Sequence, residues 1–213
     1  MLFFITSIAY ANDLKDTLNK AKKSIQKKDF AAVAHHLAKA DQEISKTQII
    51  VRPEQIILTT HYKALVAYLQ GEDPIPIWRQ AFVLNPYFDW DKVIDDRKAS
   101  ELFYLVRSEV EYYPKVPTHI PKKVGLAKTF VDGVPLKYKS KVLEGTHLLQ
   151  MQCPKGEIVS KWSDLIEDPQ WIAMCPYEFD VNESNDDLFS LDMDMGIDMG
   201  IDVYLYIGMH IQM

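Results

Sequence analysis

Two cysteines are the only thiols in this 213-residue chain, and they are the first candidates for chemistry. Cys153 and Cys175 lie far apart in the sequence with no histidine at ligand spacing, so they do not match a zinc site. In an oxidising compartment an even pair favours a disulfide, which would close a loop of about twenty residues and add roughly 3 kcal/mol. Two separate buried thiols are the alternative.

The histidines and the clustered acids lack the spacing of a catalytic or metal site. His35 and His36 are adjacent, so on a helix they project about 100° apart and cannot share a metal ion. His61 is isolated, and His147 lies where a turn enters a strand, which is a structural position. No glycine follows the aspartates at 89, 91, 95 and 96 at the calcium-loop position, which favours a solvated turn between helices. Without a Ser-His-Asp order, a phosphate loop or a metal triad, the sequence predicts a protein that is not an enzyme and uses no cofactor.

Lysines in the middle of the chain form the candidate binding surface. A strand over residues 137–143 would place three lysines on one face, because side chains alternate with period two. The candidates are Lys137, Lys139 and Lys141, together with Lys128. Nucleic acid is not expected as a partner, because no arginines or stacking aromatics are interleaved. An anionic glycan, a lipid headgroup or an acidic protein segment fits better, and a face that only keeps the sheet soluble is the alternative.

Residues 12–113 carry the pattern of amphipathic helices. Apolar stripes with helical spacing predict five helices that begin near Asp13, Phe30, Pro53, Ile77 and Lys98. Short connections imply that consecutive helices are antiparallel neighbours. Trp78 and Tyr62 are further candidate binding residues on this half.

The helical half resembles an array of tetratricopeptide repeats. The aromatic, large and small positions of the second helix of a repeat are matched by Phe30, Leu37 and Ala40. Its large, small and terminal proline positions are matched again by Trp78, Ala81 and Pro86. The resemblance implies a concave face that binds peptides or other proteins. A plain helical bundle that serves as a spacer is the alternative.

A β-rich region follows the helices. Residues 114–121 hold three prolines and predict a stiff linker between two domains, because proline biases the preceding residue to extended geometry. Within residues 122–177, Asp132-Gly133 separates two β-prone runs and signals a hairpin, because both residues tolerate a positive φ. Glu144-Gly145 makes a second break. Two such breaks predict a small antiparallel β-module.

This module resembles the PEGA domain, a small β-sandwich of bacterial envelope proteins. Residues 130–135 follow the V-D-G hairpin of that family, and residues 143–147 follow its later E-G-x-H turn. Leu143 stands where the family prefers proline. The resemblance implies an envelope scaffold rather than an enzyme.

The first eleven residues predict export. An apolar run over residues 2–8 precedes Ala9-Tyr10-Ala11, a small-x-small cleavage pattern directly before Asn12. We therefore interpret residues 1–11 as a secretory signal without its basic n-region, which predicts a location in the periplasm or cell envelope. A buried N-terminal strand is the alternative.

The C-terminal region is acidic and alternates in polarity. Residues 1–161 hold all 24 Lys and Arg against 18 Asp and Glu, whereas residues 162–213 hold 12 acids and no Lys or Arg. After a polar connector, every odd position from Phe189 to Met213 is apolar, which predicts a β-hairpin with its turn near residues 196–200. The hairpin either supplies strands to an outer-membrane barrel, which two strands alone cannot close, or lays its apolar face on the β-module.

Together these patterns predict an α+β protein. Its expected parts are a helical repeat or bundle over 12–113, the linker, a small antiparallel β-sandwich over 122–177, and a connector and C-terminal β-hairpin over 178–213. The expected function is that of a non-enzymatic exported scaffold or adaptor that binds protein partners or an anionic envelope surface. The alternative is an outer-membrane-associated component whose C-terminal segment supplies barrel strands, and the oligomeric state stays open.

Overall fold

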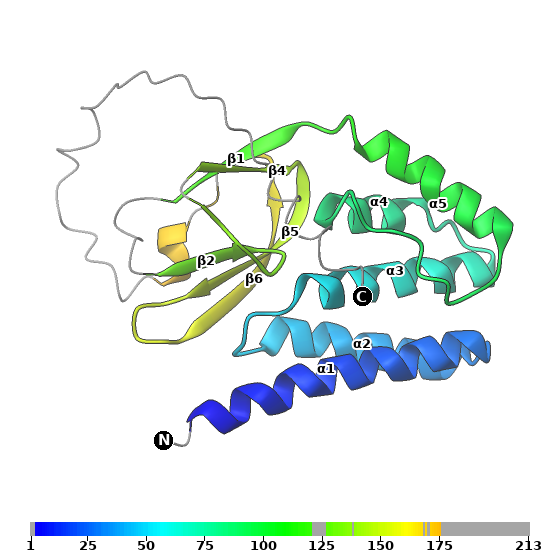
Figure 1. Cartoon of the computed structure of the whole chain (residues 1–213), viewed down its shortest axis with the longest axis horizontal. Coiled ribbons are helices and arrows are strands. Elements are labelled where there is room, and N and C mark those ends of the chain that lie inside the picture. The colour runs from blue at the N-terminus through cyan, green and yellow to red at the C-terminus, as the bar shows by residue number, and fades with distance from the viewer. Residues whose placement is uncertain (1–2, 121–126, 138, 168, 170, 176–213) are drawn as a thin grey trace, which may run out of the picture.

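The computed structural model describes residues 3–120, 127–137, 139–167, 169 and 171–175 (Figure 1). In this part of the chain the helices come first and two antiparallel sheets follow, so the fold is α+β, as the sequence predicts. The polar connector and the expected C-terminal hairpin lie outside the described residues. No helix within the described ranges is both long and apolar enough to cross a membrane.

Five helices occupy the N-terminal half of the described chain. They are α1 (Phe3–Gln26), α2 (Phe30–Lys46), α3 (Pro53–Gln70), α4 (Ile75–Leu84) and α5 (Arg97–Val110). All five expected helices are confirmed, and their apolar stripes face inward, as buried Leu18, Val33 and Ile57 show. α1 begins at Phe3, before the expected start at Asp13, so an N-terminal strand is wrong.

Local sequence signals set several helix ends. The Asp29 side chain accepts a hydrogen bond from the backbone N–H of Ala32 at 3.1 Å and so caps α2. Asp96 caps α5 in the same way through the N–H of Ala99 at 3.0 Å. α3 ends at Gly71, whose φ of 78° is a left-handed conformation that glycine adopts without strain.

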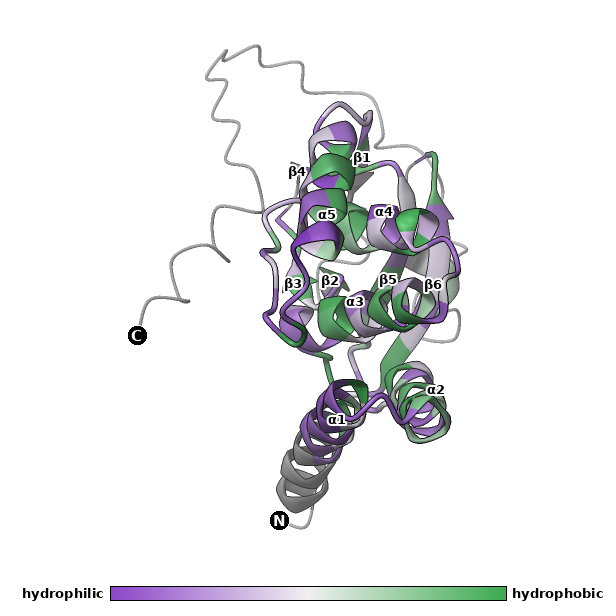
Figure 2. Cartoon of the chain, turned by 90° about the vertical axis from the view of Figure 1, so that its right-hand side faces the viewer, coloured by the Kyte–Doolittle hydropathy of each residue, from purple (hydrophilic) through white to green (hydrophobic). Residues whose placement is uncertain are grey.

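The helices stack side by side in chain order. α1 packs against α2 and α3, α3 packs against α4, and α4 packs against α5. In Figure 2, α1 and α2 lie at one end of the stack, followed by α3 and then by α4 and α5. Consecutive helices are therefore neighbours, as their short connections predict.

The strands of the described residues form two sheets. β1 (Lys115–His119) pairs with β4 (Lys139–Leu143) in a two-stranded sheet. The second sheet has the order β3–β2–β5–β6 and consists of β2 (Lys128–Val131), β3 (Val134–Pro135), β5 (Gly145–Gln152) and β6 (Ile158–Leu165). All pairs are antiparallel. The sheets enclose a common core that includes Val142 of β4 and Met151 of β5, which makes the predicted small β-sandwich.

The proline-rich stretch over residues 114–121 contains a strand, where the sequence predicts a linker. β1 pairs along its whole length with β4, and Val116 and Thr118 are buried. Pro117 is tolerated because, among the described residues, β1 has a partner strand on one side only, so the missing N–H need not remove a ladder hydrogen bond. The chain therefore enters the sandwich directly after α5.

The Asp132-Gly133 hairpin is confirmed. Both residues have positive φ, 52° and 77°, and the register pairs Val131 with Val134. At Glu144-Gly145, by contrast, the chain passes from β4 in one sheet to β5 in the other. β6 extends to Leu165, because it pairs with all of β5.

Strand β5 is buried on both faces and joins the two halves of the molecule. Leu148 belongs to the same apolar core as the helices. Leu149 and Met151, on the opposite face, belong to the core of the sandwich. The helices, the four-stranded sheet and the two-stranded sheet therefore form three successive layers.

Candidate functional site

The candidate lysines come from both layers of the sandwich. Lys141 lies in β4 between buried neighbours and is exposed, and Lys128 is exposed at the start of β2 in the other sheet. Lys137 is also exposed, but it precedes β4. The expectation that the strand starts at Lys137 is wrong, because the Ser140 hydroxyl bonds to the N–H and C=O of Lys137 and shapes a turn there. Lys139 is the first residue of β4, and its side chain is not among those that the structure describes.

Trp78 and Tyr62 are interior residues, so their prediction as binding residues is wrong. Trp78 is 0% exposed, and its indole N–H donates to Nδ1 of His61 at 3.2 Å. Tyr62 is 2% exposed, and its hydroxyl donates to Asp91 at 3.0 Å. Burial, followed by the charge of Asp91, raises the pKa of Tyr62. Both side chains stabilise the helical core instead of presenting a surface.

His61 lies at the centre of an aromatic cluster. Its ring packs against the rings of Trp78, Phe88, Trp90 and Phe103. Because the indole N–H donates to Nδ1, the neutral ring carries its proton on Nε2. Burial lowers the pKa of His61 to about 4, despite the opposing charge of Asp91. The ring is therefore neutral at physiological pH and packs within the helical core.

The connection between α4 and α5 contacts α1 and α3. Asp91 accepts hydrogen bonds from Lys22 of α1 at 2.9 Å and from Tyr62 of α3. Trp90 contacts His61 of α3 edge-on. The clustered aspartates thus hold the connection in place, and Asp96 caps α5.

A buried ion pair links the two turns of the β-module. Nδ1 of His147 lies 2.6 Å from Oδ2 of Asp132, and Nε2 lies 2.7 Å from the carbonyl oxygen of Leu143. Both ring nitrogens therefore face acceptors, which is the environment of a doubly protonated imidazolium. Burial lowers the pKa of His147, but the charge and hydrogen bond of Asp132 and the Leu143 carbonyl outweigh burial and raise it overall. The other carboxylate oxygen of Asp132 accepts from Leu148 N–H at 2.9 Å.

Close contacts hold the sandwich against the helices. A Cβ atom on Gly133 would overlap the carbonyl oxygen of Val51, and one on Gly145 would lie 2.7 Å from the Val83 side chain. Glycine is required at both turns for this reason as well as for its φ. Gln150 of β5 accepts from the N–H of Val51 at 3.0 Å and donates to the carbonyl of residue 49 at 3.2 Å.

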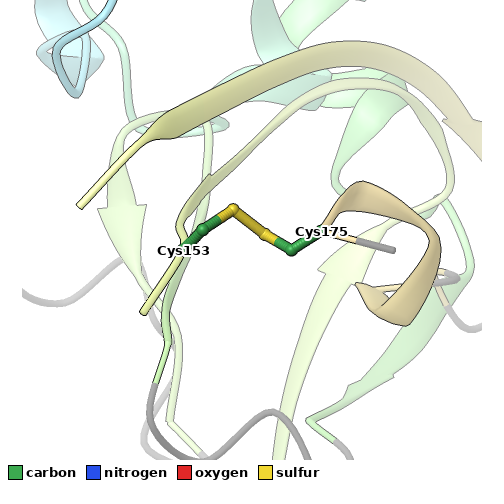
Figure 3. The surroundings of a disulfide bond; sticks show 2 residues. All are labelled: Cys153 and Cys175. Carbon is green, nitrogen blue, oxygen red and sulfur yellow. A yellow bond between two sulfur atoms is a disulfide. The ribbon is translucent and has the colours of Figure 1, made fainter. Parts of the chain in front are cut away.

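Cys153 and Cys175 form the predicted disulfide (Figure 3). Their Cα atoms are 6.1 Å apart, within the range that a disulfide requires. The bond ties the end of β5 to the short 3-10 helix η2 (Trp171–Met174), and both cysteines are buried in the sandwich core beside Trp171.

Among the described residues no group of three His, Cys, Asp or Glu side chains is placed to hold a metal ion. Comparisons with protein-family models, with curated proteins and with solved structures found no match for this chain. The resemblances to tetratricopeptide repeats and to the PEGA domain therefore stay predictions.

Proposed function

We propose that this protein is an exported, non-enzymatic scaffold of the cell envelope whose β-sandwich binds an anionic partner. The distribution of charge carries the proposal. Residues 12–113 hold 15 Lys and Arg and 15 Asp and Glu, whereas residues 114–161 hold nine lysines against three acids. One of these acids, Asp132, is buried with His147. The exposed lysines of the sandwich therefore favour an anionic glycan, a lipid headgroup or an acidic segment.

Two further observations support export and a scaffold role. Disulfides persist in exported proteins and are rare in the cytosol, so the Cys153–Cys175 bond agrees with an oxidising compartment. The shared strand β5 and the bonds of Gln150 hold the helices and the sandwich as one body. Such a body presents the lysines at a fixed position relative to the helices.

Binding of the full-length protein to anionic lipid vesicles tests the basic surface, with zwitterionic vesicles and a polyglutamate peptide as the other arms. The sandwich variant carries Lys128→Gln, Lys137→Gln and Lys141→Gln. A matched control makes the same change on exposed lysines in the charge-balanced half, at Lys15, Lys20 and Lys27.

Each lysine near an anionic surface contributes about 1 kcal/mol, so the sandwich variant should bind roughly 100-fold more weakly than wild type. The control should bind nearly as wild type. Preference for vesicles over the peptide identifies a lipid-like surface, and the reverse identifies an acidic protein segment. Equal weakening of both variants, or no binding to either anionic probe, contradicts the proposal.

Mass spectrometry of the protein isolated from its host tests export separately. We expect a mature form that begins at Asn12, because Ala9-Tyr10-Ala11 matches a cleavage site. A cytoplasmic pool that retains Met1 contradicts export.

A further inference from the structure

The connection between α4 and α5, whose residues 85–96 are all described, contains no helix or strand. The N–H groups of Phe88 and Val93 donate to carbonyls within the connection itself. Side chains hold it on α1, α3 and α5, because three of its aspartates accept hydrogen bonds from residues of these helices. The bonds join Asp91 to Lys22 and Tyr62, Asp89 to Tyr104, and Asp96 to Tyr68. A segment held in this way can open locally while the rest of the protein stays folded.

His61 of α3 lies beneath this connection. Phe88 and Trp90 of the connection contact its ring edge-on, with ring centroids 5.2 Å and 5.5 Å from that of His61. Both are only partly buried, whereas Trp78 of α4 and Phe103 of α5, which also contact His61, are 0% exposed. Water therefore reaches His61 most readily where the connection moves.

The closed structure has no place for a second proton on His61. The indole N–H of Trp78 donates to Nδ1 at 3.2 Å, so the proton of the neutral ring is on Nε2. A second proton must bind Nδ1, where it would face the Trp78 N–H, and two donors repel each other. The charged ring is therefore accommodated only after this bond is broken, and burial makes that charge costly.

The charged groups that act on His61 are Asp91 of the connection and Lys22 of α1. Asp91 favours protonation, Lys22 opposes it, and the two are themselves paired at 2.9 Å. α4 and α5 present only the uncharged rings of Trp78 and Phe103. Burial is the largest effect and lowers the pKa of His61 from 6.5 to about 4.

We propose that residues 85–96 form an acid-sensitive cover over the helical core. A proton from the solvent binds Nδ1 of His61, the bond from Trp78 breaks, and the connection moves away while the helices and the sandwich stay folded. The aspartate bonds do not trigger this opening. Hydrogen bonds, from Tyr104 to Asp89 and from the Ala99 N–H to Asp96, lower the pKa of each carboxyl, so both bonds are lost only below the ordinary value of 3.8.

Hydrogen–deuterium exchange of the full-length protein at pH 7.5 and pH 4 tests the cover. The covered His61 binds a proton less tightly than the hydrated ring, so the cover is most stable above pH 6.5 and loses stability as the pH falls towards 4. These two pKa values make opening about 100-fold more favourable at pH 4 than at pH 7.5. After correction for intrinsic exchange, amides of residues 87–95 should lose protection by this factor, whereas β5 should keep its protection.

Two pairs of variants assign the response. His61→Phe keeps a ring in the cluster but cannot titrate, so protection of residues 87–95 should differ by less than about threefold between the two pH values. Its control, His36→Phe, changes a histidine of α2 outside the cluster and should respond as wild type. Asp91→Asn removes the charged bond to Lys22 and should lower protection about tenfold at pH 7.5. Asp41→Asn breaks the comparable pair with Lys63 and should leave residues 87–95 unchanged.

NMR titration of the His61 ring in wild type decides the matter if His61→Phe does not fold. The ring should take up its proton over the pH range in which residues 87–95 lose protection. Unchanged protection of these residues at pH 4 would overturn the proposal, as would equal pH responses of wild type and His61→Phe. Simultaneous loss of protection in β5 would also overturn it, because the protein would then unfold as a whole. The vesicle measurements concern lysines of the sandwich, so the cover and the proposed function fail separately.

Discussion

The buried pair of His147 and Asp132 gives the sharpest prediction. Asp132→Asn removes the countercharge but keeps a side chain that tolerates the positive φ of 52° at this turn. The imidazolium would then be buried without an anionic partner, with His147 0% exposed. Loss of one partner of a buried pair costs about 3–5 kcal/mol, and Asn can still accept from Leu148 N–H, so we expect a loss of about 3 kcal/mol at pH 6.

The dependence on pH distinguishes this pair from a simple packing defect. In wild type the pKa of His147 is raised above its unfolded value of about 6.5, so its stabilisation is complete below that pH and is lost as the pH rises through the folded pKa. In Asp132→Asn only burial and the hydrogen bond to the Leu143 carbonyl still act on the pKa of His147, and burial lowers that pKa. The variant should therefore lose stability as the pH falls, and its difference from wild type should shrink at pH 9.

Urea unfolding at pH 6 and pH 9, with NMR of the His147 ring nitrogens, measures both effects. Asp164→Asn is the matched control, because Asp164 is exposed in the same module, and its free energy of unfolding should change by less than about 0.5 kcal/mol. A wild-type His147 that titrates below pH 6.5, or an equal loss at both pH values, would refute the assignment of an imidazolium.

Three other perturbations test separate parts of the fold. Wild type should lose up to about 3 kcal/mol of stability as the pH falls from 6.5 towards the His61 pKa of about 4, and thermal melts of His61→Phe should lack this loss. In urea titrations Gly133→Ala should cost about 3 kcal/mol or more, since its Cβ overlaps backbone, whereas Gly156→Ala, with open space around it, should cost only about 1–2 kcal/mol of strain. Cys153→Ser should lower the unfolding free energy by about 2–4 kcal/mol and make it insensitive to reductant, whereas a reductant-insensitive wild type would mean that Cys175 is unpaired.

Local signals explain what the sequence could predict. The five helices follow from apolar spacing and caps such as Asp29, and the hairpin follows from two residues that both tolerate positive φ. The cysteine pair follows from an even count. Each of these features depends on residues close in the chain or on simple counting.

Features that depend on distant partners could not be predicted. The sequence predicts a linker where β1 lies because residues 114–121 hold three prolines, and only the pairing with β4 makes this segment a strand. Trp78 and Tyr62 are large aromatic residues that suit a surface or a core equally well. Their contacts with His61 and Asp91 place them in the core, and the sequence does not show these contacts. Asp132 and His147 lie at two turns that are separate in the sequence. Only the fold brings their side chains into contact.

The burial of both faces of β5 couples the helices and the sandwich mechanically. Because one strand belongs to both cores, tension between the helices and the sandwich would load hydrogen bonds inside a sheet instead of extending a proline-rich tether. Many of these bonds must break together before the ends can separate. Two bodies attached at opposite ends of the protein would thus be held at a set spacing.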